Sequence, residues 1–547
     1  MKYKIIISIL TLGMLFLGFS TLKPKDSIRL KQFNYPVLKG KDNNPVLRIC
    51  YVNNSKKKTL KSVKINLSGT HISDLAEARV FFTGKDSVFR DKVQYGKTLG
   101  TFNELIFSGS KTLSKGNNYI WISYKLSEDC NLTGKVDAGL DYLTVNNKNI
   151  SAKEISPKGK LRTGIAVRKS RDDGVHTYRI PGLATSLKGT LLGVYDIRRD
   201  FGRDLQGNID IGLSRSVDGG NTWEPMRIVL DMKTWGGLPE KFNGVSDASV
   251  LVDRNNNTIF IAGLWMHGVI NSKGEWIERL NEKSREWNHQ WRNKGSQPGW
   301  GAKQTSQFLI TKSTDDGKTW SKPVNLTKMC KDPNWWLWAP APGHGISLKD
   351  GTLVFPTQGR DENGQPFSNI TFSKDGGQTW KTSNAATHNT TESMAVELSD
   401  GGIMLNIRDN RNREEKGDKN GRAIAVSYDL GETWKEHATS HGVLIEPVCM
   451  ASVHRHNFKD KQGSQRSILL FSNPNSKYKR IKQTIKVSFD EGMTWPEKYW
   501  IELDEGKGAG YSCLTSIDDH TIGILYEGSQ AHMTFQKLKL NEILKNN

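Results

Sequence analysis

The chain has 547 residues, 36% of them hydrophobic, so it can form several domains of about 150 residues with apolar cores, and low-complexity and collagen-like classes are excluded. Its formal net charge of +21 suggests an anionic partner, but the charge is unevenly distributed. Residues 23–160 carry 25 Lys and Arg against 12 Asp and Glu, whereas residues 161–547 carry 51 against 45. We therefore expect no nucleic-acid partner.

Residues 1–22 are predicted to be a signal peptide. Lys2 and Lys4 precede a 15-residue, mainly apolar run from Ile5 to Phe19, which is shorter than the roughly 20 residues of a membrane span. An uncleaved N-terminal anchor is the alternative. No later stretch is apolar enough to cross a bilayer. We therefore expect an exported protein without a stable membrane span, located in the periplasm, at the cell surface or outside the cell.

The five cysteines do not form a regular pattern. An odd, sparse set in a long exported chain is not a disulfide framework, although a Cys50–Cys130 bridge within the first domain is possible. There is no Cys-x-x-Cys pair and no cluster of His and Cys. The sequence therefore predicts no metal site.

Residues 23–158 are predicted to form a β-sandwich domain. The segments 63–67 and 119–124 alternate apolar and polar residues, as half-buried strands do, and clusters of Asn, Gly and Lys separate such segments. Short strands without helical periodicity are typical of an antiparallel sandwich. The stretch 151–160 resembles a linker.

The rest of the chain contains an internal repeat. The pattern Ser-x-Asp-x-Gly-x-Thr-Trp, called the Asp box below, occurs five times and ends at Trp223, Trp320, Trp380, Trp434 and Trp495. The spacings between these tryptophans are 97, 60, 54 and 61 residues, and a four-stranded propeller blade with its loops fits the shorter ones. The first spacing is longer by nearly one blade or contains an insertion, which we place around 265–304.

The Asp boxes are predicted to be structural. Asp accepts hydrogen bonds from turn amides, Gly allows positive φ, and Trp packs back on the sheet. A second unusual stretch, 335–345, is rich in Trp, Pro and Gly, which excludes a helix and favours a loop. Its aromatic side chains are expected either to stack on sugar faces or to pack against the insertion.

The Asp boxes and the motif Tyr178-Arg179-Ile180-Pro181-Gly182 resemble the bacterial exo-α-sialidase (neuraminidase) family, whose repeat is also called the BNR repeat. The resemblance implies an all-β protein in which a six-bladed β-propeller, residues 159–547, follows the N-terminal domain. It also implies an enzyme that hydrolyses terminal α-linked sialic acids of glycoproteins, glycolipids such as gangliosides, and oligosaccharides.

By this resemblance, three arginines bind the carboxylate of sialic acid. Arg179 matches the first, Arg408 the second and Arg480 the third. Arginine suits this role because its planar guanidinium binds a carboxylate bidentately and stays charged. Nearby competitors are Arg411 for the second position, and Arg455 and Arg466 for the third.

Three further residues match the catalytic groups of the family. Tyr511 matches the nucleophile, Glu392 the base that removes its proton, and Asp204 the acid/base residue on a mobile loop. A neutral phenol avoids the repulsion that a carboxylate would meet at the anomeric carbon, which itself bears a carboxylate. The loop of Asp204 is where we expect a pKa raised by burial or by closure on the substrate. The competitors are Glu397 for the base, and Asp196, Asp200 and Asp210 for the acid.

Three residues match supporting positions. Glu527 matches the glutamate that orients the first arginine, and Arg198 and Asp247 match residues that contact a ring hydroxyl. Arg199 could replace Arg198. The implied reaction proceeds with retention through a tyrosyl intermediate and requires neither a metal nor an organic cofactor.

Two rival functions use the same fold: a trans-sialidase, and a catalytically inactive propeller that binds sialoglycans. The inactive form would be expected to have lost Tyr511, Glu392 or Asp204, yet all three occur in motif context. We expect a monomer whose partners are sialylated glycans. The excess positive charge of residues 23–160 suggests weak, salt-sensitive docking to acidic glycans or a cell surface.

Overall fold

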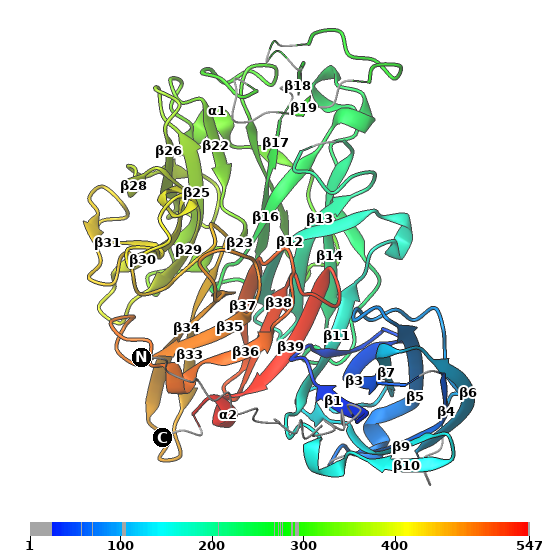
Figure 1. Ribbon diagram of the computed structural model, residues 1–547. Coiled ribbons are helices and arrows are strands. Elements are labelled where there is room, and N and C mark those ends of the chain that lie inside the picture. Colours follow the sequence, from blue (N-terminus) through cyan, green and yellow to red (C-terminus); the bar gives the residue numbers. More distant parts are fainter. Residues whose placement is uncertain are drawn as a thin grey trace, which may run out of the picture.

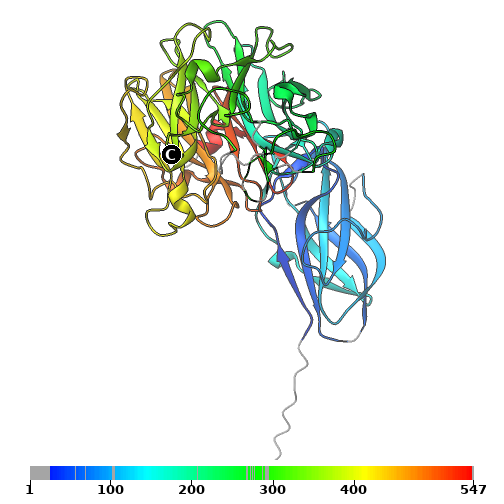
Figure 2. The same ribbon diagram turned by 90° about the horizontal axis from the view of Figure 1, so that it is seen from above.

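A computed structural model describes residues 25–544, apart from residues 56, 68, 101–104, 206, 267, 268, 272, 274, 276, 286, 287 and 290–294. The predicted signal peptide lies outside the described residues. The regular secondary structure of the described chain is mostly strand; besides short 3-10 turns it contains two short α-helices, α1 (Thr327–Cys330) and α2 (Leu540–Leu544). Neither helix is long and apolar enough to cross a membrane. Figures 1 and 2 show a smaller N-terminal domain beside a larger body.

The N-terminal domain contains two four-stranded sheets that share a core. Buried side chains from both sheets, including Ile49, Val63, Ile120 and Leu143, belong to one apolar cluster. In order across each sheet, the strands are β1 (Ser27–Lys31), β3 (Asn44–Asn53), β7 (Gly116–Leu126) and β5 (Leu75–Gly84), and then β10 (Lys148–Ser151), β9 (Gly139–Val145), β4 (Lys58–Asn66) and β6 (Ile106–Leu113).

The possible Cys50–Cys130 disulfide is wrong. Both thiols are free and buried. Cys50 lies in β3, where its Sγ accepts a hydrogen bond from the Arg29 guanidinium at 3.5 Å, whereas Cys130 lies in the turn after β7. The two thiols therefore have different surroundings, and the domain is held together by its apolar core.

In the described residues, the larger body consists of six sheets besides a small hairpin. The first sheet contains β12 (Thr177–Thr185), β13 (Leu191–Arg198), β14 (Ile209–Ser216) and β15 (Arg227–Leu230). The second contains β16 (Val245–Val252), β17 (Ile259–Trp265), β20 (Gln307–Ser313), β21 (Val324–Asn325) and β23 (Gly343–His344). The third contains β22 (Leu337–Pro340), β24 (Ile346–Ser347), β25 (Leu353–Arg360), β26 (Pro366–Ser373), β27 (Lys381–Thr382) and β28 (Thr387–His388). The fourth contains β29 (Thr390–Glu397), β30 (Ile403–Asp409), β31 (Ala423–Ser427) and β32 (Lys435–Glu436), and the fifth contains β33 (Ser452–Lys459), β34 (Gln465–Pro474), β35 (Gln483–Ser488) and β36 (Ile501–Asp504).

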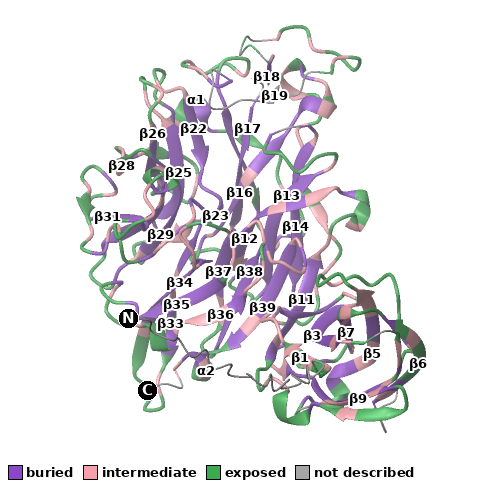
Figure 3. Ribbon diagram, in the orientation of Figure 1, coloured by how far each residue is buried: buried purple, intermediate pink, exposed green. Residues whose placement is uncertain are grey.

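The sixth sheet joins the two ends of this body. It combines β37 (Ser512–Asp518), β38 (Thr521–Tyr526) and β39 (Met533–Lys539) with β11 (Leu161–Arg168), β8 (Lys135–Val136) and β2 (Val37–Lys39). Strand β2 comes from the N-terminal domain and pairs in parallel with β11, so the domains share this sheet. Buried side chains of neighbouring sheets pack together, and the residues coloured as buried lie along the strands (Figure 3). The predicted all-β fold, with an N-terminal domain and a propeller, is confirmed.

Each Asp box begins at the last residue of a strand; these strands are β14, β20, β26, β31 and β35. In the box at the end of β26, Asp375 accepts hydrogen bonds from Ser373 Oγ at 2.7 Å and from the Thr379 amide at 2.9 Å. In the first sheet, Ser216 pairs with Leu191, whereas Arg198 at the other end of β13 pairs with Ile209. The boxes therefore close turns at the end of the sheet opposite to Arg198, as their structural interpretation predicts.

The long first spacing contains an insertion between β17 and β20. Part of it is the hairpin of β18 (Val269–Ile270) and β19 (Asn288–His289). The stretch 335–345 is not a loop, because it contributes strands β22 and β23. Its Trp338 is fully buried and stacks on Phe308 with ring centroids 4.4 Å apart, while Trp335 packs on Phe367 at 4.7 Å. Isolated Pro and Gly fit these short strands because each pairs over only a few residues.

Candidate functional site

The predicted site residues converge on one cleft at the ends of the inner strands. Seven of the nine line it directly: Arg179, Asp204, Asp247, Glu392, Arg408, Arg480 and Tyr511. The other two, Arg198 and Glu527, contact Asp204 and Arg179. The cleft has a cavity volume of about 120 Å³.

Local backbone irregularities place three of these side chains. The register of β12 shifts between Arg179 and Gly182, that of β16 between Ser246 and Ser249, and that of β29 between Thr390 and Ser393. Such bulges turn a side chain away from the regular alternation of a strand. Ile180 and Asp247 also have positive φ values of 62° and 60°, which L-residues seldom adopt. Strain of this kind concentrates at functional sites.

Tyr511 is the centre of the cleft. It precedes β37, and its side chain is buried. The guanidinium carbons of Arg179 and Arg480 lie 5.3 and 5.4 Å from its ring centroid, and Arg408 Nη1 donates a hydrogen bond to its Oη at 2.9 Å. Three guanidinium groups therefore surround one phenol.

Two of the arginines have donors that no described residue uses. Arg179 donates from Nε to Glu527, but its Nη1 and Nη2 make no hydrogen bond within the described chain. Arg408 Nε is buried and has no partner among the described residues. Arg480 donates to the carbonyls of Ala509 and Val448 at 2.8 and 3.2 Å, which fix it beside Tyr511. Unused donors on adjacent guanidinium groups can bind a carboxylate.

Glu392 is the proton acceptor for Tyr511. The phenol donates a hydrogen bond to Glu392 Oε1, and Arg408 binds the other carboxylate oxygen at 2.5 Å. Burial and the charge of Glu392 raise the pKa of Tyr511 well above its usual value, while Arg408 and Arg480 oppose this. The phenol is therefore neutral in the free site, with a base in contact and with positive charge available to stabilise a phenolate.

Glu527 fixes the first arginine and the nucleophile strand together. It follows β38 and accepts hydrogen bonds from Arg179 Nε at 2.5 Å, from the Ile180 amide at 2.8 Å and from the Tyr511 amide at 3.0 Å. Burial would raise its pKa, but Arg179 and these amides lower it below the usual value. Glu527 is therefore a charged anchor beneath the cleft.

Asp204 lies in the loop between β13 and β14 and is 64% exposed. Its carboxylate is 2.6 Å from Arg198 Nη1. Desolvation would raise the pKa of Asp204, but Arg198 and Arg179 lower it below the usual value. The expected raised pKa is therefore wrong for the ligand-free site, because the same arginines that attract an anionic ligand also stabilise the charged form of Asp204.

Asp247 and Asp196 complete this side of the cleft. Asp196 is fully buried and accepts hydrogen bonds from Arg198 Nη2 at 2.8 Å, Ser246 Oγ at 2.6 Å and the Asp247 amide at 3.1 Å. Burial and the charges of Asp196, Glu392 and Asp204 raise the pKa of Asp247 well above its usual value. Asp247 can therefore donate a hydrogen bond, and Asp196 holds Arg198 in place.

The competing residues have partners elsewhere or lie outside the cleft. Arg199 pairs with Asp210 at 2.9 Å, and Arg411 with Asp409 at 3.0 Å. Further competitors with other partners are Arg455, which binds Glu491, Arg466, which binds Asp460, and Glu397, which accepts from the Lys349 amide. None of these residues, nor Asp200, lines the cleft formed by the described chain. The ion pairs and hydrogen bonds of these residues thus distinguish them from the cleft residues, which sequence spacing alone could not do.

One wall of the cleft is apolar and is not singled out by the sequence. It is formed by Leu205, Leu264, Leu337 and Ala339, which belong with Met266 to one small apolar cluster. Leu337 and Ala339 belong to the Trp-rich stretch, so that stretch reaches the cleft through its aliphatic residues. Gln358, Asn410 and Arg413 also line it. Among the described residues, no group of three His, Cys, Asp or Glu side chains could hold a metal ion.

Comparison with known proteins identifies the family of this chain. Residues 180–498 match the BNR repeat-like domain, and residues 25–149 match the N-terminal domain of BNR-repeat neuraminidase. A sialidase of Bacteroides fragilis is 40% identical over 548 residues, which cover 95% of this chain and 96% of that protein. The chain belongs to the bacterial BNR-repeat sialidase family.

Other members of this family are similar to part or most of this chain. The sialidase of Micromonospora viridifaciens is 32% identical over 65% of this chain and 50% of its own length. The structure of the Hadza microbial sialidase Hz136 is 37% identical, with a TM-score of 0.83 over 94% of this chain and 99% of that one. Most of this sialidase-family chain, 94% of it, thus has a structural counterpart.

Proposed function

We propose that this protein is an exo-α-sialidase that hydrolyses terminal α-linked sialic acids from glycoproteins, glycolipids and oligosaccharides. The observation that carries the proposal is the group at Tyr511, a phenol bonded to a buried glutamate and surrounded by three arginines. A carboxylate at the reacting carbon of the substrate explains both the arginines, which bind it, and the choice of a neutral phenol beside it. The family and its glycoside hydrolase relatives support the same activity.

Binding is governed by the arginines. The free nitrogens of Arg179, with Arg408 and Arg480, hold the substrate carboxylate over the Tyr511 hydroxyl. Asp247 and Arg198 contact a ring hydroxyl, and the apolar wall at Leu337 and Ala339 suits the methyl group of an acetamido substituent. The anionic substrate also adds negative charge beside Asp204, which raises the pKa of that carboxyl from its low ligand-free value.

In the first chemical step, a bond forms between Tyr511 Oη and the anomeric carbon while the bond to the aglycone oxygen breaks. The phenolic proton passes to Glu392 Oε1, and Asp204 gives its proton to the departing oxygen. The neutral phenol approaches the carboxylate-bearing carbon without like-charge repulsion. Arg408 stabilises the negative charge that develops on the phenol oxygen.

In the second step, water attacks the same carbon and transfers its proton to Asp204. The bond to Tyr511 Oη breaks, and Glu392 returns the proton to the phenol. Two displacements at one carbon give net retention of configuration. Every residue in this scheme belongs to the described chain. We also propose that the protein acts after export, on glycans outside the cytoplasm.

The test is release of a fluorescent aglycone from 4-methylumbelliferyl α-sialoside by the wild-type protein, Tyr511→Phe and Asp204→Ala. Hydrolysis by the wild-type protein and its loss in Tyr511→Phe are the expected results. Full activity of Tyr511→Phe would overturn the mechanism. An inactive wild-type protein that binds sialoglycans would overturn the activity itself.

A further inference from the structure

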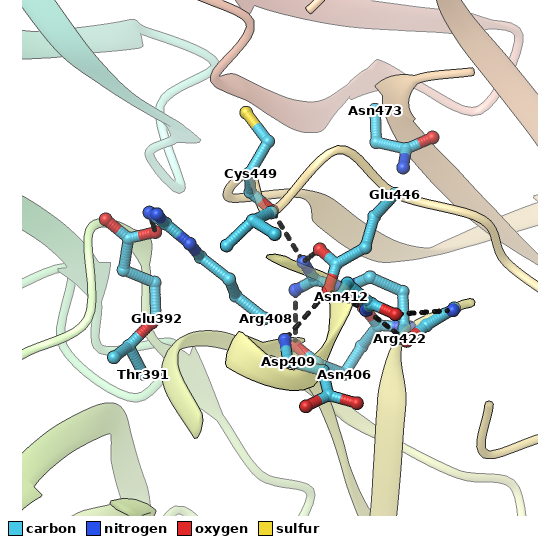
Figure 4. A network of polar contacts seen from close by, with 12 residues as sticks. Thr391, Glu392, Asn406, Arg408, Asp409, Asn412, Arg422, Glu446, Cys449 and Asn473 are labelled. Carbon is cyan, nitrogen blue, oxygen red and sulfur yellow. Dashed lines mark hydrogen bonds and ion pairs between the residues drawn. The ribbon is translucent and has the colours of Figure 1, made fainter. Parts of the chain in front are cut away.

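A fully buried ion pair lies behind the arginine cluster. Arg422 precedes β31 and Glu446 lies between β32 and β33, and both side chains are 0% exposed. Arg422 Nη1 is 2.6 Å from Glu446 Oε2. Figure 4 shows this pair on the far side of Arg408 from Glu392, and neither residue lines the cleft. The mechanism above does not use it.

One side of the pair holds the backbone that carries Arg408. Glu446 Oε1 accepts a hydrogen bond from the Asp409 amide at 2.7 Å, in the peptide that immediately follows Arg408. Arg422 donates from Nε to Asn406 Oδ1 at 2.7 Å and from Nη2 to the Asn406 carbonyl at 3.2 Å. The pair thus fixes the strand on both sides of the second arginine.

The other side holds the segment to which Arg480 is bound. Arg422 Nη1 also donates to the Cys449 carbonyl at 2.6 Å. The preceding carbonyl, that of Val448, accepts from Arg480 Nη2 at 3.2 Å. Val448 has a φ of 54°, which is strained for a β-branched residue and persists only where its surroundings hold it. One guanidinium therefore links the supports of Arg408 and Arg480.

A buried ion pair is a costly way to stabilise a core. Apolar residues of similar volume often serve as well, because two charges must lose their hydration. Here Glu446 has further partners: Asn412 Nδ2 donates to Glu446 Oε1 at 2.8 Å, and Asn420 bonds both the amide and the carbonyl of Glu446. The result is a rigid, directional network in which each contact fixes a position.

We propose that Arg422 and Glu446 are positioning residues that set the spacing between Arg408 and Arg480, so that both bind one substrate carboxylate. The inference rests on the proposed function. A displacement of about 1 Å in such a clamp can lower the rate about 100-fold. Disturbing the pair should therefore weaken the recognition of the carboxylate specifically.

The test measures equilibrium binding rather than turnover. The ligand is 2,3-didehydro-2-deoxy-N-acetylneuraminic acid, a carboxylate-bearing analogue, and its methyl ester is the uncharged comparison, both by isothermal titration calorimetry. In Glu446→Gln, the amide oxygen can still accept from the Asp409 amide, but the ion pair is lost. We expect the Kd of the acid to rise at least tenfold and that of the ester less than threefold.

The matched control is Asp316→Asn. It breaks another buried ion pair, in which Asp316 lies 3.2 Å from Arg215 Nη2. The side chains of Arg215 and Asp316 are 3% and 7% exposed, and neither lines the cleft. Both variants should unfold at a lower temperature, but the control should bind the acid as the wild-type protein does. In an Arg480→Gln background, Glu446→Gln should change the Kd of the acid less than threefold, because one partner of the clamp is already missing.

Three results would overturn the inference: a folded Glu446→Gln protein with wild-type affinity for the acid, equal losses for acid and ester, or the same loss in Asp316→Asn. If Glu446→Gln does not fold, Arg422→Lys replaces it, because lysine keeps the charge beside Glu446 but cannot reach Asn406 and Cys449 together. A wild-type protein that binds neither ligand would overturn the proposed function, and this inference with it. Wild-type binding with an unaffected variant overturns the positioning role alone.

Discussion

Replacing Glu392 by glutamine tests the proton transfer on which the proposed mechanism depends. The variant keeps the size of the side chain but cannot accept the phenolic proton of Tyr511. Even at the usual pKa of about 10, ionising a phenol at about pH 7 costs about 4 kcal/mol. Loss of a positioned base typically lowers a rate about 10²- to 10⁴-fold, or about 3–5 kcal/mol, and we expect kcat to fall within this range.

The residual activity of Glu392→Gln should depend on pH in a defined direction. Without its base the phenol must ionise alone, so kcat should rise about tenfold per pH unit below the phenol pKa. Glu392 raises the pKa of Tyr511, whereas Arg408 and Arg480 lower it. Removing the charge of Glu392 therefore lowers the pKa of the Tyr511 phenol. The rise of kcat with pH should accordingly level off at a lower pH than the phenol pKa of the wild-type site.

The assay is kcat for 4-methylumbelliferyl α-sialoside at intervals between pH 5 and 9, since this leaving group needs little protonation by Asp204. Glu397→Gln is the control. Glu397 lies on the same strand, but it accepts a hydrogen bond from the Lys349 amide at 3.1 Å and does not line the cleft. Wild-type kcat in Glu392→Gln, or residual activity that does not rise with pH, would refute the reasoning.

Three further variants test separate parts of the site and fold. Asp204→Ala should lose about 10²- to 10⁴-fold in kcat/KM with a sugar leaving group but far less with an aryl one, and equal losses would contradict its role as the acid. Glu527→Gln should lower the free energy of unfolding by about 3–5 kcal/mol, because Arg179, which is only 17% exposed, loses the charge of its buried partner. Since the pKa of Glu527 is lowered in the fold, the loss of stability in Glu527→Gln should be largest at neutral pH and shrink as the pH falls below about 4. Urea unfolding of the variant and the wild-type protein at neutral pH and below pH 4 measures this loss. A loss that is the same at both pH values would contradict the account. Asp375→Ala should lower the thermal midpoint, because the Asp box loses its hydrogen bonds, yet change kcat/KM less than about twofold; a large kinetic loss would mean that the box affects the site.

The repeat pattern is what makes the fold readable from the sequence. Each Asp box starts at the last residue of a strand in a different sheet, so the spacing between boxes reports the number of residues from one sheet to the next. The first spacing is longer because residues between β17 and β20 are inserted. The Trp-rich stretch is harder to interpret, because Pro and Gly signal a break in regular structure while its short strands pair over only a few residues. Whether Trp338 faces a ligand or the core depends on Phe308, far away in the sequence.

The site was predictable as far as motifs extend. Residues with recognisable neighbours, such as Arg179 and Tyr511, could be placed, and the structure brings them together. The pKa values of the site residues are harder to predict, because they depend on groups from other parts of the chain. The pKa of Asp204, for example, is lowered by Arg198 and Arg179. The Arg422–Glu446 pair has no motif of its own, and its connection to Arg408 and Arg480 exists only in three dimensions.

The most direct test of the central claim is to identify the residue that forms a covalent bond with the sugar. In 2,3-difluorosialic acid, fluoride leaves the anomeric carbon readily, while the fluorine beside it slows the later attack by water, so an intermediate should accumulate. Peptide mass mapping of the wild-type protein after incubation should place the fluorosialyl group on Tyr511, and Tyr511→Phe should carry none. A label on Asp204 or Glu392, or turnover without any labelled residue, would contradict the account.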